Sequence, residues 1–170
     1  LISLLSCLVV SCVEADLISS SLPFIASSLE IKTEQSHFLL TSSFLGLSIG
    51  SLFVGIISEI LGIRKTMLVG LFILFFGSLM CSLTFNYLIM VYGRFFQGVG
   101  AACSIVLVFV FIDNKYKKDA AERIISYVNF LITIASSLSP IFGSFITHYF
   151  GWRINMVVIG LISLINFFLL

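Results

Sequence analysis

The chain alternates between long apolar runs and short polar connections. Six runs are mostly apolar over a length that fits a bilayer-spanning helix, which needs about 20 such residues. The strands of transmembrane barrels instead alternate polar and apolar residues over about ten positions. Because these runs are continuous and the connections short, the pattern predicts an all-α membrane protein with six transmembrane helices, consecutive helices lying antiparallel. The predicted spans are 1–28, 37–58, 66–85, 87–112, 124–148 and 154–170.

The composition agrees with a membrane protein. Hydrophobic residues make up 59% of the chain and charged residues 10%, whereas about a quarter of a soluble domain is charged. A soluble fold of 170 residues has too little interior for so many apolar side chains, so we expect the lipid bilayer to surround this one. The net charge of +1 and the lack of a charged tail give no reason to expect a nucleic-acid partner.

The basic residues of the connections predict the orientation. Cytoplasmic connections of membrane proteins carry an excess of lysine and arginine. The second and fourth connections hold six such residues, and the other three hold only Lys32 and Arg153. The even connections and the N-terminus are therefore expected in the cytoplasm. The six residues are Arg64, Lys65, Lys115, Lys117, Lys118 and Arg123.

Three ionisable residues lie within the predicted spans: Glu14, Asp16 and Arg94. Each costs about 2.5–3.5 kcal/mol in a membrane, so such residues usually face a bundle interior or a wet cavity. Glu14 and Asp16 point about 200° apart on a helix. We expect Asp16 to face the central cavity and to exchange protons; the alternative is a static partner for Arg94 or for backbone groups. Asn129 is expected to line the same cavity.

Arg94 has two possible roles. A permanently charged guanidinium at that depth needs an acid or backbone carbonyls beside it. By approaching and leaving an acid it can control when that acid is charged, which is a usable proton-coupling device. Alternatively, it is a structural centre of hydrogen bonds.

Small residues predict where helices pack closely, because membrane helices gain contact where backbones can approach. Gly46 and Gly50 form a GxxxG pair, and the small cluster at 98–102 and the serine- and glycine-rich stretch at 135–144 are similar. Pro140 removes a backbone hydrogen bond and predicts a kink; Pro23 does the same near the outer end of the first span.

The sequence lacks the motifs of several common catalytic and binding sites. There is no phosphate-binding GxxxxGK[ST] loop, no Ser-His-Asp arrangement, and no CxxC pair among the four cysteines. We therefore expect no enzyme activity, no metal and no cofactor.

The second connection, GIISEILGIRK, resembles a loop of the major facilitator superfamily that runs Gly, three residues, Asp, two residues, Gly, one residue, and then two bases. Four further stretches resemble family motifs in the same order: DLISSSLP at 16–23, YGRFFQGVGAA at 92–102, ASSLSPIFGS at 135–144 and GWR at 151–153. Together they resemble the drug:proton antiporters, and most closely the Bcr/CflA branch of bicyclomycin and chloramphenicol exporters. The matching loop residues are Gly55, Glu59, Gly62, Arg64 and Lys65.

The resemblance implies a twelve-helix transporter of the bacterial inner membrane, of which this chain is the N-terminal half and a C-terminal half is the partner. It implies proton-coupled efflux of small, partly apolar drugs or metabolites by alternating access. It also implies a cytoplasmic gate in which Glu59 pairs with Arg64 and meets the region of Asp113, with Gly55 packing closely and Gly62 permitting the reversal. The helix-packing and antiporter positions are Gln97, Gly98, Gly100, Pro140 and Gly143.

The sequence departs from the family pattern at two kinds of position. Glu59 stands where aspartate is usual, and Ser139 stands before Pro140 where glycine is common. Both changes predict a weaker gate and a straighter fifth span. Two alternatives to drug efflux stay open: a truncated half that does not transport, and a permease for sugars or other nutrients.

Overall fold

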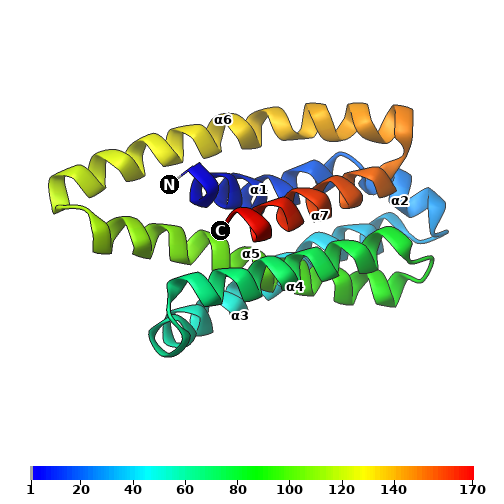
Figure 1. Cartoon of the computed structure of the whole chain (residues 1–170). Coiled ribbons are helices and arrows are strands. Elements are labelled where there is room, and N and C mark those ends of the chain that lie inside the picture. The colour runs from blue at the N-terminus through cyan, green and yellow to red at the C-terminus, as the bar shows by residue number, and fades with distance from the viewer. Residues whose placement is uncertain (1) are drawn as a thin grey trace.

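The structure is a computed structural model that describes residues 2–170, with side chains from residue 3 onward. It is an all-α bundle with no strand among these residues, as predicted (Figure 1). Figure 1 shows α6 lying along α1, while α3, α4 and α5 form the other side of the bundle. The helices are α1 (Ile2–Ser19), α2 (Leu22–Ser28), α3 (Thr33–Leu61), α4 (Ile63–Leu83), α5 (Tyr87–Lys115), α6 (Lys118–Phe150) and α7 (Trp152–Leu169).

The predicted spans match these helices with one correction. Five helices are long and apolar enough to cross a membrane, and six spans result if α1 and α2 count as one. The span predicted at 1–28 is not one straight helix, because α1 and α2 meet at 60°; its first residue, Leu1, lies outside the described residues. Pro23 sits in the first turn of α2, where its missing N–H costs no helical hydrogen bond.

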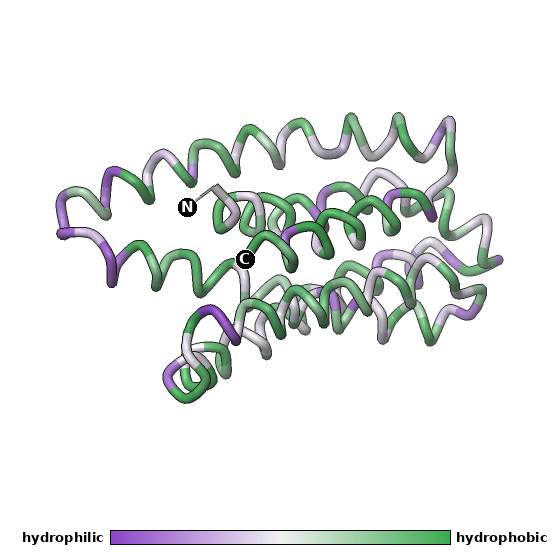
Figure 2. The backbone as a smooth tube through the Cα atoms, in the orientation of Figure 1, coloured by the Kyte–Doolittle hydropathy of each residue, from purple (hydrophilic) through white to green (hydrophobic). Residues whose placement is uncertain are grey.

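The other helices extend beyond the predicted boundaries at one end or both, although α4 ends at Leu83, before the predicted end at 85. For example, α6 begins at Lys118 and not near 124, and α3 starts at Thr33. The extensions are polar ends that hydropathy alone assigns to the connections. Figure 2 shows the hydrophilic residues gathered at the turns between helices. Helix α1 begins and helix α7 ends on the side of the α3–α4 and α5–α6 turns (Figure 1), near which the six basic residues lie; that this side is cytoplasmic stays a prediction.

Two glycines make the tight reversals between long helices. Gly62 joins α3 to α4 with φ 85°, and Gly151 joins α6 to α7 with φ 88°. A side chain is strained at such positive φ values, so glycine is favoured there. The reversal predicted at Gly62 is present, whereas its part in a gate stays a prediction. Helix α6 is continuous through Pro140, so the residue does not break the helix.

Close backbone packing centres on α5. A Cβ added at Gly98 would come within 1.9 Å of the Ser43 carbonyl oxygen of α3, and one at Gly100 within 2.6 Å of the Gly70 carbonyl oxygen of α4. The glycine-rich face of α5 therefore packs on two helices, which confirms the packing predicted from small residues. Gly55 is a correction: nothing lies within 4 Å of a Cβ built there, so it makes no close contact within the described bundle.

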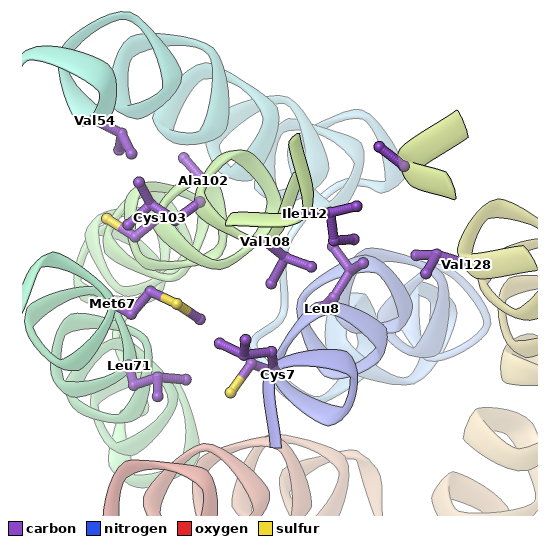
Figure 3. Packing of buried hydrophobic residues seen from close by; sticks show 13 residues of the cluster. Cys7, Leu8, Val54, Met67, Leu71, Ala102, Cys103, Val108, Ile112 and Val128 are labelled. Atoms are coloured by element: carbon purple, nitrogen blue, oxygen red, sulfur yellow. The ribbon is translucent and has the colours of Figure 1, made fainter. Parts of the chain in front are cut away.

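A buried apolar cluster fills the half of the bundle near the chain ends (Figure 3). Figure 3 shows Cys7 and Leu8 of α1 facing Met67 of α4 and Ile112 of α5, with Val128 arriving from α6. The cluster joins α6 to the other helices at this level. The ionisable residues of the spans, in α1 and α5, lie closer to the opposite end of the bundle.

Candidate functional site

The centre of the candidate site is a buried ion pair between two helices. Arg94 of α5 donates through Nη1 to Oε1 of Glu14 on α1, at 2.5 Å. The Arg94 side chain is fully buried and that of Glu14 is 2% exposed. A buried ion pair gains little net stability, but removal of one partner leaves a costly unpaired charge. The pair therefore couples the position of α1 to that of α5.

Gln97 and Ser78 extend this pair across the bundle to α4. Arg94 Nη1 also donates to Oε1 of Gln97, whose Nε2 donates to Oγ of Ser78 at 2.7 Å. The Ser78 hydroxyl in turn donates to the Leu74 carbonyl oxygen at 2.9 Å. The thiol of Cys81 lies 3.8 Å from Gln97 Oε1. One chain of polar contacts thus links α1, α5 and α4 inside an apolar bundle.

The guanidinium of Arg94 is only partly satisfied. Its Nε and Nη2 atoms are buried and have no hydrogen-bond acceptor among the described residues. A buried donor without an acceptor costs free energy. Arg94 can therefore take another acceptor without giving up a fully satisfied arrangement.

Asp16 occupies a different environment from Glu14. It is partly exposed, and its carboxylate makes no ion pair or hydrogen bond with residues 2–170. The two acids therefore face different surroundings, as their spacing predicts. The structure identifies Glu14 as the partner of Arg94, whereas the cavity role assigned to Asp16 stays a prediction.

Asn129 belongs to an exposed polar stripe on α6. Six polar residues follow one another at helical spacing along this helix, and all are exposed. The hydroxyls of Thr133 and Ser137 donate to backbone carbonyl oxygens four residues earlier, so their lone pairs stay free. Polar side chains within a span usually face a cavity or another helix, so the exposure of Asn129 allows its cavity role, which stays a prediction. The stripe consists of Ser126, Asn129, Thr133, Ser137, Ser144 and His148.

The predicted gate residues lie at the end of the bundle that carries the basic turns. Glu59, Arg64, Lys65 and Asp113 are all exposed. The expected pair of Glu59 with Arg64 is not formed, because the Glu14–Arg94 pair is the one ion pair within the described chain. Arg64 instead lines a cavity of about 430 Å³ together with apolar residues of α1, α4 and α5. The long, exposed side chains at this turn have no fixed partner within this bundle.

The opposite end holds a polar cluster that the sequence analysis did not single out. Ser21, at the break between α1 and α2, shares a hydrogen bond of 2.6 Å with Thr147 of α6. Asn155 of α7 donates to Ser21 and Thr147 at 3.0 and 2.9 Å. Single polar residues in a span give no signal of mutual contact, so only the fold brings these three together. The cluster fixes the place where the first span bends.

Comparison with known proteins gives related sequences. The family model described as Major Facilitator Superfamily matches residues 4–170. The chain is 26% identical over 159 residues to the multidrug resistance protein MdtL of Citrobacter koseri, with 91% of this chain and 41% of that protein covered. It is 28% identical over 156 residues to the MdtL of Salmonella typhimurium, with 88% and 40% covered. The chain thus spans about two fifths of these curated relatives.

Solved structures show the same fold. The inward-open structure of the xylose transporter XylE from E. coli matches with a TM-score of 0.82 at 17% identity, covering 99% of this chain and 46% of that one. The crystal structure of a D-xylose-proton symporter matches with a TM-score of 0.78 at 18% identity, covering 99% and 46%. The helical half-bundle is that of these transporters, and the family model matches nearly the whole chain. The chain therefore belongs to the Major Facilitator Superfamily.

Proposed function

We propose that the protein to which this chain belongs exports small, partly apolar drugs or metabolites in exchange for protons. The observation that carries the proposal is the buried Glu14–Arg94 pair. An ionisable pair inside a membrane bundle is costly and usually functional, and this one connects two helices whose relative position changes if the pair separates. The names of the MdtL relatives support drugs as substrates.

The proposed cycle uses the pair as a switch. A proton that enters from outside neutralises Glu14. The electrostatic attraction between Glu14 and Arg94 is then lost. Arg94 then turns to another acceptor, through the donors that have no partner in the present state. The half-bundles rock, the proton leaves to the cytoplasm, and the pair forms again. Substrate enters the same cavity and leaves by the opposite movement.

The remaining parts of the proposal concern the partners and the finer family. A C-terminal half completes the cavity, and the exposed stripe of α6 contributes Asn129 to its wall. Asp16, partly exposed and unpaired, is the second candidate for the proton-exchanging acid. Membership of the Bcr/CflA branch and a location in the bacterial inner membrane rest on the motif resemblance.

Substitution of the two acids separates their roles. In everted vesicles with the full-length protein, an imposed pH gradient is expected to drive ethidium or chloramphenicol uptake. Glu14→Gln is expected to lower this uptake at least tenfold, because the switch can no longer change its charge. Asp16→Asn, the matched control from the same helix, is expected to keep gradient-driven uptake. Transport is measured by ethidium fluorescence and by labelled chloramphenicol.

The opposite result would exchange the roles proposed for Glu14 and Asp16. If Asp16→Asn uncouples transport and Glu14→Gln does not, Glu14 is a static partner of Arg94 and the proposed switch is wrong. Labelled xylose in the same vesicles tests the permease alternative. Uptake of xylose without uptake of either drug would contradict the export proposal.

A second substitution tests the proposed gate. Glu59→Gln removes the charge of an exposed residue at the α3–α4 turn that needs no partner within this bundle. We expect transport by the full-length protein to fall about fivefold to tenfold, in line with the loss of one charge-assisted contact, while membrane insertion is unchanged. Quantitative immunoblotting of membranes and vesicle transport provide the two measurements. Unchanged transport would show that the turn only sets the topology.

A further inference from the structure

We infer that Ser78 of α4 is a positioning residue that orients Gln97 and thereby holds Arg94 against Glu14. The inference rests on the proposed function, because it assigns a role in the same proton switch. Ser78 makes no hydrogen bond to Glu14 or Arg94 in the part of the chain that the structure describes; it acts through the amide of Gln97. The residue is 1% exposed, so its hydroxyl has no access to bulk water.

The direction of each hydrogen bond fixes the orientation of the amide. The Ser78 hydroxyl has one proton, which it donates to the Leu74 carbonyl oxygen at 2.9 Å. Toward Gln97 the hydroxyl can therefore only accept, and the amide must turn its Nε2 to Ser78. The opposite end of the amide, Oε1, then faces Arg94 Nη1 and accepts from it. A reversed amide would place its NH2 donors against the guanidinium and its carbonyl oxygen against a hydroxyl that has no proton left to give.

The fold places Ser78 where it can do this. A Cβ added at Gly77 would come within 2.7 Å of the Gly93 carbonyl oxygen and 2.8 Å of the Gln97 nitrogen, so α4 and α5 touch through their backbones beside Ser78. On the other side, Gly160 of α7 lies close to the Ser78 Cβ. Contact from both sides holds the hydroxyl in its place between α5 and α7.

The neighbourhood also supplies a matched control. Ser78 and Ser82 both line an apolar groove of about 240 Å³ between α4 and α7. Ser82 is also buried, but its hydroxyl donates only to the Leu79 carbonyl oxygen, three residues earlier. It makes no hydrogen bond to the polar side chains of the site. The two serines thus share helix, groove and burial and differ in their link to Gln97.

Loss of the Ser78 hydroxyl has a defined consequence for Glu14. Gln97 becomes free to rotate, Arg94 loses a fixed acceptor, and the guanidinium is held less firmly against the carboxylate. The titratable and charged groups at this site are Glu14 of α1, Arg94 of α5 and Cys81 of α4. Helices α6 and α7 add none there, since their charged or titratable residues in the described chain lie near their ends. The contact between Arg94 and Glu14 is therefore less firmly fixed without Ser78.

The test is infrared spectroscopy of the purified full-length protein at one fixed pH. The carboxylate band that is absent from Glu14→Gln identifies Glu14. Ser78→Ala is expected to shift the position of this band, because the hydrogen bond from Arg94 to the carboxylate is held less firmly. Ser82→Ala is expected to leave the band in place, and Ser78→Thr, which keeps a hydroxyl, is expected to restore its position. In a Gln97→Ala background, Ser78→Ala is expected to add no shift.

The outcomes separate this inference from the proposed function. An unmoved band in Ser78→Ala, an equal shift in Ser82→Ala, or a full extra shift in the Gln97→Ala background would overturn the positioning role. If Glu14→Gln keeps gradient-driven uptake, the proton switch fails as a function, while the band positions still test the positioning role. Thermal unfolding tests the same role independently: the inference predicts that Ser78→Ala lowers the melting temperature less in a Glu14→Gln background, whereas equal effects would contradict it.

Discussion

Arg94→Met is expected to abolish proton-coupled transport and to destabilise the bundle by about 3–5 kcal/mol, the usual cost when one partner of a buried ion pair is removed. The Arg94 side chain is fully buried, and its partner Glu14 is 2% exposed. Methionine leaves that carboxylate, together with Oε1 of Gln97, without the guanidinium. Arg94→Lys is not expected to restore function, because lysine has no counterpart to Nε and Nη2, the donors through which Arg94 takes its second acceptor in the proposed cycle.

The double variant Arg94→Met with Glu14→Leu provides the control. Replacement of both partners of a buried pair by apolar residues is often neutral or stabilising, so this variant is expected to regain stability but not transport. Thermal unfolding of the purified full-length protein and vesicle uptake of ethidium give the two readings. If Arg94→Met keeps the stability of the natural protein, the pair described here is not formed in the membrane.

Gly98→Leu is expected to prevent assembly of the half-bundle. Even a Cβ at this position would lie 1.9 Å from the Ser43 carbonyl oxygen and 2.8 Å from the Leu47 nitrogen. These are backbone atoms of α3 and cannot move aside without displacing the helix. We expect the folded protein recovered from membranes to fall more than tenfold, because overpacking at a rigid contact costs several times the usual 1–3 kcal/mol.

Gly55→Leu is the matched control on α3. Nothing lies within 4 Å of a Cβ built at Gly55, so the folded amount is expected to stay near that of the natural protein. Size-exclusion chromatography in detergent compares the two variants. Equal recovery of Gly98→Leu and Gly55→Leu would contradict the close α3–α5 packing.

The sequence predicted the helices well because each span has to satisfy one requirement, an apolar surface long enough for the bilayer. The bend between α1 and α2 was harder to predict from the sequence. Pro23 indicated a disturbance, but the break falls at Ser20 and Ser21, where Thr147 and Asn155 supply hydrogen bonds from helices distant in the chain. The sequence around the bend does not indicate such distant partners.

The candidate site was predicted in part for the same reason. The cost of charge in a membrane singled out Glu14, Asp16 and Arg94, and helical spacing separated the two acids. Which acid meets Arg94 depends on how α1 is rotated against α5, and the structure gives Glu14. Ser78 was missed because it is one of several serines in a span, and only the backbone contact of α4 with α5 brings it to Gln97.

The gate differs again, because the predicted contact of Glu59 with Arg64 is not formed within the described bundle. Glu59, Arg64 and Asp113 are exposed and unpaired within the described bundle. Motif resemblance grouped them, and no contact inside this half-bundle adds to that grouping. Their role in a gate stays a prediction, which Glu59→Gln tests.

The most direct test of the account is the proton release that a drug causes in the absence of a gradient. Ethidium is added to the purified full-length protein in weakly buffered detergent solution, and a pH-indicator dye records the release. The account predicts release by the natural protein and by Asp16→Asn, and none by Glu14→Gln. Release by Glu14→Gln equal to that of the natural protein would contradict the claim that the Glu14–Arg94 pair couples protons to transport.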